Sequence, residues 1–167
     1  YTGCSNYPAW QVVRSLWISD HSLLARFDCV QPHYSLVHRA EYERELRDVC
    51  KVFDLGVIPY SPLGGGFLSG KYRRDNDIIS QRRDRASKYF TDKNWALLDL
   101  LDSVASVHNS ASVSQVALAW MLQDETITSP IIGPRTLEQL QDNLASLELK
   151  LENGEIDQIN LASDWRS

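Results

Sequence analysis

A chain of 167 residues that is 43% hydrophobic and 23% charged can bury a core and fits one ordinary domain. The formal net charge of -5, with basic residues scattered apart from the run at 82–85, excludes a nucleic-acid partner, which requires a positive face. The sequence contains no apolar run long enough to cross a bilayer and no charged-then-apolar leader, so we expect no membrane partner.

The three cysteines, Cys4, Cys29 and Cys50, form neither a C-x-x-C pair nor another metal-ligand spacing. Because an odd number is a poor disulfide framework, a reducing compartment is expected. We therefore predict a cytoplasmic protein without a metal site, in which these thiols are inert packing.

The first third of the chain predicts strands that alternate with helices. The opening residues YTGCS are typical of the end of a strand, and apolar residues at helical spacing predict a helix over 8–23. Residues 27–35 predict a strand that stops near a proline. A second helix is predicted over 40–56, ending at Gly56.

The middle of the chain contains a short apolar strand and an unusual connection. The strand is predicted over 57–61, and the polar, aperiodic segment 73–90 is too long for an ordinary loop, so it is either disordered or a functional lid. Helices are predicted over 92–109 and 114–124, and Ser112 is the expected cap of the second.

The last third predicts a fourth strand over 127–133, a helix over 136–148 and a final helix over 152–163. This alternation predicts an α/β fold with parallel strands, organised as one region, 1–167, of four βα units and a C-terminal helix. The length favours an open sheet. The unusual residues fall at the carboxyl ends of the strands, which favours part of a TIM (β/α)8 barrel.

The glycine-rich segment PLGGGFLSGKY at 62–72 leaves two alternatives. From Gly65 it reads G-x-x-x-x-G-K, but Tyr72 stands where a nucleotide-triphosphate loop needs a hydroxyl for magnesium. The GK pair also leads into a poor helix start, which argues against such a loop. The segment is either a flexible turn with a solvated Lys71, or a backbone that approaches a pyrophosphate with Lys71 as a point charge.

These residues resemble the aldo-keto reductase family over nearly the whole chain. Four ordered segments carry the resemblance: GCSNY at 3–7, VQPHYSL at 30–36, IPYSPLGGGFLSGKY at 58–72 and IIGPRTLEQLQDN at 131–143. The family is a TIM barrel that binds NADPH without a Rossmann fold, and no G-x-G-x-x-G occurs here. The resemblance implies parallel (β/α) units that form the C-terminal half of a TIM barrel, with NADP(H) as cofactor.

The resemblance also assigns residues to parts of the cofactor. Ser5 and Asn6 would hold the nicotinamide carboxamide together with Gln31, and Tyr60 would stack on the ring. Lys71 would be the counter-charge of the pyrophosphate. The other contacts to the pyrophosphate would come from Ser61, Pro62, Leu63, Gly64, Gly65 and Arg85.

The segment after the last predicted strand is similar to the family's site for the adenosine 2′-phosphate. Gly133 would offer an amide, Arg135 a guanidinium, and Gln139, Asp142 and Asn143 would face the adenine from one side of a helix. Many members place a Lys-Ser pair near the glycine and an arginine where Gln139 stands. This departure leaves NAD as an alternative to NADP.

Each of these residues also has a purely structural interpretation. Asn6 could cap the helix that begins near Pro8. The other structural interpretations are a buried amide for Gln31, a core aromatic for Tyr60, a solvated helix residue for Asp142, and packing roles for His33 and His38.

The family's chemistry requires residues that the resemblance does not place in this chain. A tyrosine, its pKa lowered by a lysine paired with an aspartate, donates a proton while a histidine orients the substrate. This tetrad belongs to strands two to four of the barrel, whereas the matched segments begin at strand five. No catalytic residue is therefore assigned, and this chain alone is not expected to be active.

The resemblance implies a function for the full-length protein: reduction of small aldehydes or ketones, or oxidation of the alcohols, by hydride transfer. A half barrel exposes two strand edges, so a missing N-terminal half or a second copy of the chain is the expected partner. The alternative is a non-catalytic NADPH-binding regulatory module, or a half barrel that associates with itself.

Overall fold

The computed structural model describes residues 1–74, 83–109 and 111–166. Its sheet is parallel, with strand order β1-β2-β3, and Val30 lies between Cys4 and Val57 in the register. The strands are β1 (Gly3–Ser5), β2 (Cys29–Gln31) and β3 (Gly56–Val57). The helices are α1 (Ala9–His21), α2 (Ala40–Glu43), α3 (Leu46–Val52), η1 (Gly64–Ser69), α4 (Arg83–Ser87), α5 (Asp92–Val107), α6 (Val113–Leu122), α7 (Leu137–Leu144), η2 (Ala145–Leu147) and α8 (Asn153–Ala162).

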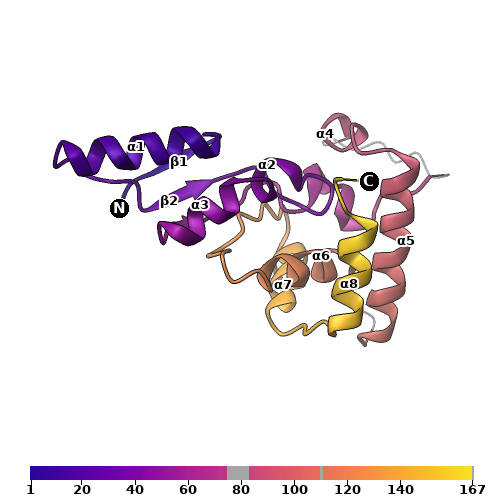
Figure 1. The fold of residues 1–167 in the computed structure, drawn as a ribbon. Helices are drawn as coiled ribbons and strands as arrows, with labels where there is room; N and C mark the ends of the chain where they lie inside the picture. Colours follow the sequence, from indigo (N-terminus) through magenta and orange to yellow (C-terminus); the bar gives the residue numbers. More distant parts are fainter. Residues whose placement is uncertain (75–82, 110, 167) are drawn as a thin grey trace.

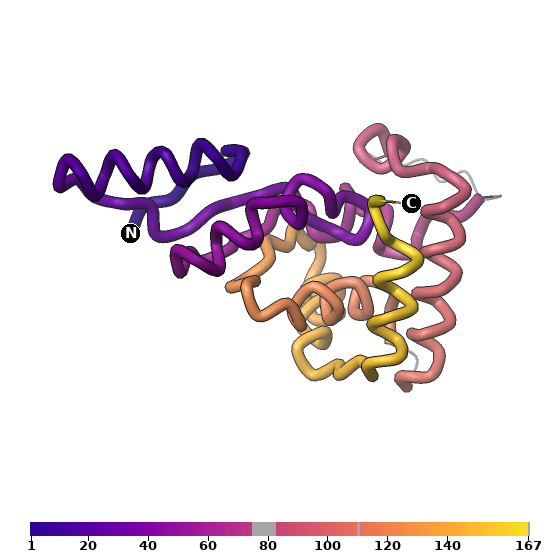
Figure 2. The backbone as a smooth tube through the Cα atoms, in the orientation of Figure 1, coloured from indigo at the N-terminus to yellow at the C-terminus, as the bar shows by residue number. Residues whose placement is uncertain are grey.

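The molecule is elongated. In Figure 1, β1 and α1 lie at one end and the packed pair α5 and α8 lies at the other. The tube in Figure 2 shows that the sheet and α3 connect the two ends. The parallel strands and many helices give the α/β class that the sequence predicted.

The predicted strand over 127–133 is wrong as a continuous strand. The segment forms two isolated parallel bridges instead, Ile127 with Val57 and Ile131 with Tyr60. Pro130 lies between the bridges and lacks an amide hydrogen, so the ladder cannot continue through it. The segment still extends the parallel order beyond β3. The other predicted strands are shorter than expected, and Pro32 directly follows the end of β2.

The predicted helix over 40–56 is wrong in its continuity and its end. It divides into α2 and α3 at Arg44 and Glu45, where Glu45 has a φ of -147°. The chain leaves α3 through Asp54, whose φ of 51° is left-handed, and the amide of Leu55 donates to Cys50 O at 2.9 Å. Gly56 therefore belongs to β3 and not to a helix end.

The C-terminal helices follow the sequence more closely. Ser112 caps α6 as predicted, since its hydroxyl accepts the amide hydrogen of Gln115 at 3.1 Å. In the predicted loop 73–90, residues 75–82 lie outside the described residues. The remainder is not wholly irregular, because α4 forms within it and buries Ala86.

A buried ion pair joins the loop after β2 to the C-terminal helix. Arg39 Nε lies 2.6 Å from Glu43 Oε1, and a second donor of Arg39 lies 3.1 Å from Oε2. Glu43 also accepts from the Tyr34 hydroxyl at 2.8 Å and from Trp165 Nε1 at 3.2 Å. Arg39 donates in turn to the Asn160 carbonyl at 3.0 Å. Segments about 120 residues apart in sequence are thereby fixed to each other.

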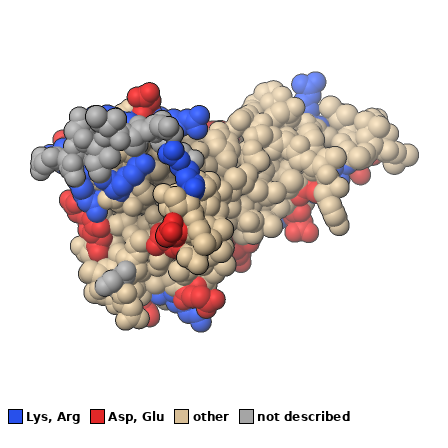
Figure 3. Space-filling view, turned by 180° about the vertical axis from the view of Figure 1, so that it is seen from behind, with Lys and Arg blue, Asp and Glu red and all other residues tan. Residues whose placement is uncertain are grey.

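The N-terminal end leaves apolar side chains in solvent. α1 buries Ala9, Val12 and Leu16 but exposes Trp10 and Trp17. In Figure 3, this end carries few charged side chains on the face shown. Basic side chains gather instead at the opposite end of the molecule, where α5 and α8 lie. Exposed aromatic residues on one element are typical of a surface that packs against another chain or segment. None of the described helices is both long and apolar enough to span a membrane.

Replacing the buried acid should test the ion pair. We expect Glu43→Ala to lower the free energy of unfolding by about 3–5 kcal/mol, because it leaves the Arg39 charge buried without its carboxylate. Urea unfolding followed by circular dichroism measures this change. Glu45→Ala, at an exposed position two residues later, is the control and should change stability by less than about 0.5 kcal/mol. Equal effects of the two variants would contradict the network.

The buried thiol of Cys50 should be unreactive in the folded protein. Burial raises the pKa of Cys50 to about 12, and the nearby thiol of Cys4 adds to the shift. Because the thiolate is the reactive form, we expect Cys50 to resist alkylation by iodoacetamide at pH 8 until the protein is unfolded. Peptide mass spectrometry of native and urea-treated protein measures the modification. Rapid labelling of native Cys50 would show that this part of the core is open.

Candidate functional site

The glycine-rich segment after β3 folds into a tight curl. Ser61, Gly64, Gly65 and Gly66 all have positive φ, between 54° and 98°. The amide of Gly64 donates to Ser61 O, and the amide of Gly66 donates to Leu63 O, both at 2.9 Å. Three consecutive residues in the left-handed region require glycine, since other residues pay about 1–2 kcal/mol there. The segment is therefore an ordered turn with a defined backbone conformation.

A second wall is built by the segment that leads into α7. Thr136 caps this helix by accepting the amide hydrogen of Gln139 at 3.3 Å, and the amide of Arg135 donates to Gln139 Oε1 at 2.8 Å. Asp142 accepts from the Ser112 hydroxyl at 2.9 Å and from Gln115 Nε2 at 2.7 Å. These bonds hold α7 against α6 and fix the direction of its first turns.

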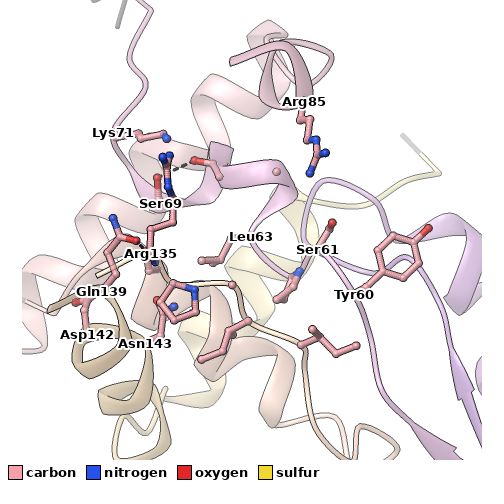
Figure 4. Close-up of a pocket in the computed structure, with 18 residues that line it drawn as sticks. Tyr60, Ser61, Leu63, Ser69, Lys71, Arg85, Arg135, Gln139, Asp142 and Asn143 are labelled. Atoms are coloured by element: carbon pink, nitrogen blue, oxygen red, sulfur yellow. Dashed lines mark hydrogen bonds between the residues drawn. The ribbon is translucent and has the colours of Figure 1, made fainter. Parts of the chain in front are cut away.

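The two walls enclose a pocket of about 540 Å³, a size typical of small-molecule and cofactor sites. In Figure 4, Arg85 extends from α4 toward Ser61, while Lys71, Arg135 and Gln139 lie on the other side of Leu63. Most of the lining comes from residues predicted as cofactor contacts: Tyr60, Ser61, Pro62, Leu63, Gly65, Lys71, Arg85, Gly133, Arg135, Gln139, Asp142 and Asn143.

The remaining predicted contacts lie outside the pocket lining. Gly64 is a buried residue of the curl, where an added Cβ would meet Val37 Cγ2 at 2.8 Å. Ser5 and Gln31 lie together at the ends of β1 and β2, and the Ser5 hydroxyl donates to Gln31 O at 2.9 Å. Asn6 is linked to the pocket, since its Oδ1 accepts from the Tyr60 hydroxyl at 3.0 Å.

Three structural interpretations from the sequence are corrected by these contacts. Asn6 does not cap α1, because Pro8 occupies the cap position and Asn6 has a φ of 59°. Gln31 is exposed and is not a buried amide. Asp142 is not a solvated helix residue, because Ser112 and Gln115 both donate to it.

Sequence reasoning missed some of the lining. Most missed residues are next to predicted ones in the same segments, so a wider window on those segments would have found them. Ser114 differs, because it comes from α6 and no motif marks it. The missed residues are Gly66, Ser69, Ser114, Ile131, Ile132 and Pro134.

The pocket lining is positively charged. Lys71, Arg85 and Arg135 contribute three basic side chains. Asp142 is the one carboxylate among the described residues of the lining, and it already accepts two hydrogen bonds. A pocket with excess positive charge and several backbone amides at hand is suited to an anion such as a phosphate.

Tyr60 connects the pocket to a stack of aromatic rings. Its ring lies on that of His33, with centroids 4.9 Å apart and an interplanar angle of 11°, and His33 lies on His38 at 3.9 Å. Burial lowers the pKa of His33 to about 4, and His38 adds to the shift. His33 is therefore neutral at pH 7, and Tyr60 keeps one ring face supported by an uncharged ring.

The family model of the aldo/keto reductase family matches residues 1–164. The chain belongs to this family. Its relatives include an uncharacterized oxidoreductase, YrpG, of Bacillus subtilis (strain 168), 32% identical over 91% of this chain and 45% of the relative. Norsolorinic acid reductase B of Dothistroma septosporum is 29% identical over 97% of this chain and 41% of the relative.

A third relative is a probable aldo-keto reductase of Glycine max, 32% identical over 78% of this chain and 38% of the relative. This chain thus spans less than half the length of the curated relatives that it matches. Their names place it in a family of oxidoreductase enzymes.

The glycine curl can be tested by adding one methyl group. Gly65→Ala should lower the free energy of unfolding by at least about 1–2 kcal/mol, because its φ is 65° and the new Cβ would lie 3.0 Å from Arg85 O. Urea unfolding measures the loss. Gly154→Ala in α8, where no atom lies within 4 Å of the added Cβ, is the control and should show no loss. Similar stability of the two variants would contradict the strained curl.

Proposed function

We propose that this chain is the C-terminal half of an NADP(H)-dependent aldo-keto reductase barrel, and that its pocket holds the pyrophosphate and the adenosine 2′-phosphate of the cofactor. The observation that carries the proposal is the meeting of Lys71, Arg85 and Arg135 around one pocket. The pocket lies beyond the carboxyl end of β3, and ligands of parallel α/β folds bind at such ends.

The two walls suit different parts of the dinucleotide. The curl at Gly64–Ser69 brings backbone close to the pocket, where a pyrophosphate can approach without a side chain in the way. Arg135 has a planar guanidinium that suits a phosphate monoester, and Gln139 and Asn143 lie on the same side of α7 as the pocket. This arrangement supports NADP(H) as the cofactor in preference to NAD(H).

The nicotinamide end would reach toward β1 and β2. Tyr60 belongs both to the pocket lining and to the contact with Asn6, so it marks the direction in which the cofactor extends. Ser5 and Gln31 lie beside each other in the parallel register and present polar groups that suit a carboxamide. The bound nicotinamide would supply a hydride to a carbonyl carbon. The residues of this chain would orient its ring and exclude water from one face.

The exposed apolar residues support the half-barrel part of the proposal. β1 is an edge strand, and α1 presents Trp10 and Trp17 to solvent. An upstream half would pair with this edge, cover these rings and supply the proton donor. A small aldehyde or ketone, or the corresponding alcohol, would be the substrate of the completed barrel.

Calorimetry on the chain joined to its upstream half tests the proposal. We expect NADPH to bind more tightly than NADH, and Arg135→Ala to weaken NADPH about 10- to 100-fold, the value of a charged hydrogen bond, with little effect on NADH. Lys150→Ala, at an exposed position outside both the pocket lining and α1, is the control and should bind NADPH like the unmodified protein. Equal losses for the two dinucleotides would contradict the 2′-phosphate role, and no binding of either would contradict the site.

A further inference from the structure

A tight turn between β2 and α2 brings together side chains that suit a metal ion. The amide of His38 donates to Ser35 O at 2.9 Å, and the amide of Ser35 donates to His38 O at 3.2 Å. This pair of bonds closes the turn and leaves the rings of His33 and His38 stacked, with centroids 3.9 Å apart. Glu41 follows one helical turn later, and its Oε2 lies 2.9 Å from His38 Nε2.

Three potential ligand atoms therefore meet at one place. One nitrogen from each of His33 and His38 and one oxygen from Glu41 all lie within 4.8 Å of one another. Two imidazoles and a carboxylate are a ligand set that zinc and neighbouring transition metals accept. We propose that His33, His38 and Glu41 form a binding site for a divalent transition metal ion such as Zn²⁺, with water in the remaining position.

The surroundings allow such an ion to enter and be held. Glu41 is exposed and both histidines are half-buried, so the cluster opens to solvent on one side. On the other side the turn is anchored by Tyr34 and Leu36, which are almost fully buried. The backbone that carries the ligands is thus fixed by the core, and only side-chain rotations are needed for binding.

Binding requires the two imidazole rings to unstack, because each binds a metal through a nitrogen lone pair in the ring plane and the planes of His33 and His38 are now only 22° apart. Zinc binds imidazole nitrogen and carboxylate oxygen at about 2.0–2.2 Å, which in a tetrahedron places neighbouring ligand atoms about 3.4 Å apart. The three atoms now lie within 4.8 Å of one another, so no pair has to approach by more than about 1.4 Å once the rings have turned. Binding would turn His33 relative to Tyr60, on which it stacks at 4.9 Å. An ion at this site would therefore alter one wall of the neighbouring pocket.

A second histidine–carboxylate pair offers a contrast within the same chain. His108 Nε2 lies 2.8 Å from Glu155 Oε1, as close as His38 lies to Glu41. Among the residues that the structure describes, no further histidine, cysteine or carboxylate completes a cluster of three there. The proposal therefore rests on the third ligand, His33, and not on an isolated ion pair.

Titration of zinc chloride into the chelator-treated full chain, followed by calorimetry, tests the site. We expect one Zn²⁺ per chain. His33→Ala and His38→Gln should each weaken binding by more than about tenfold, because even groups outside the first coordination sphere are worth about 10- to 100-fold. His21→Ala removes an exposed histidine of α1 and should leave binding unchanged. Circular dichroism establishes that each variant is folded.

Proton NMR with Co²⁺ in place of Zn²⁺ identifies the ligands directly. The ring resonances of His33 and His38 should show large paramagnetic shifts, while those of His21 and His108 should not. The proposal is overturned by unchanged zinc affinity in folded His33→Ala or His38→Gln, by loss of binding in His21→Ala, or by a stoichiometry of zero. This test uses no dinucleotide, so its result is separate from that of the proposed cofactor site.

Discussion

The buried pair of Arg39 and Glu43 is the polar contact that fixes the segment after β2 to the C-terminal part of the chain. Four groups hydrogen-bond to it: the nearby Tyr34 hydroxyl, and from the C-terminal part of the chain the Asn160 carbonyl, the Ser163 hydroxyl and Trp165 Nε1. A buried ion pair is stabilising only when its remaining hydrogen-bonding capacity is filled, and here both partners have additional bonds. The loop after β2, which carries the aromatic stack, is thereby held against α8.

The pocket depends on a second constraint, which is local conformation. The glycines after β3 adopt positive φ angles in succession, and Gly64 and Gly65 are each closely approached by Val37 or Arg85. The opposite wall is fixed by Asp142, which ties α7 to α6. Hydrogen bonds within the turn and between α7 and α6 hold both walls, and Lys71, Arg85 and Arg135 line the space between them. Such preorganised positive charge suits a phosphate-bearing ligand.

The two proposed sites share a boundary at Tyr60. Its hydroxyl donates to Asn6, its ring stacks on His33, and it lines the pocket. A change on either side of this ring therefore reaches the other through direct contact. The apolar surface of α1 is at the opposite end from α5 and α8, so the part of the molecule that would meet an upstream half is distinct from the basic pocket.

The sequence by itself determined the family, the alternation of strands and helices, and most of the pocket lining, because these follow from local patterns. Local sequence is enough to recognise the consecutive glycines, the cap at Ser112 and the basic residues of the motifs, whatever the path of the chain in the fold. The lengths of the strands could not be predicted in this way, because Pro130 interrupts strand pairing only where its segment lies beside β3. The break within 40–56 was likewise hidden by continuous helical periodicity.

Only the tertiary structure decided which of the motif residues share one space. It brought Ser114 of α6 into the pocket lining. It left Ser5 and Gln31 outside the lining, although they end strands that are parallel to β3. It also closed the turn that places His33 beside His38 and Glu41. The physical reason is that contacts between segments depend on packing and on backbone hydrogen bonds over long separations, whereas periodicity and motifs report only neighbours along the chain.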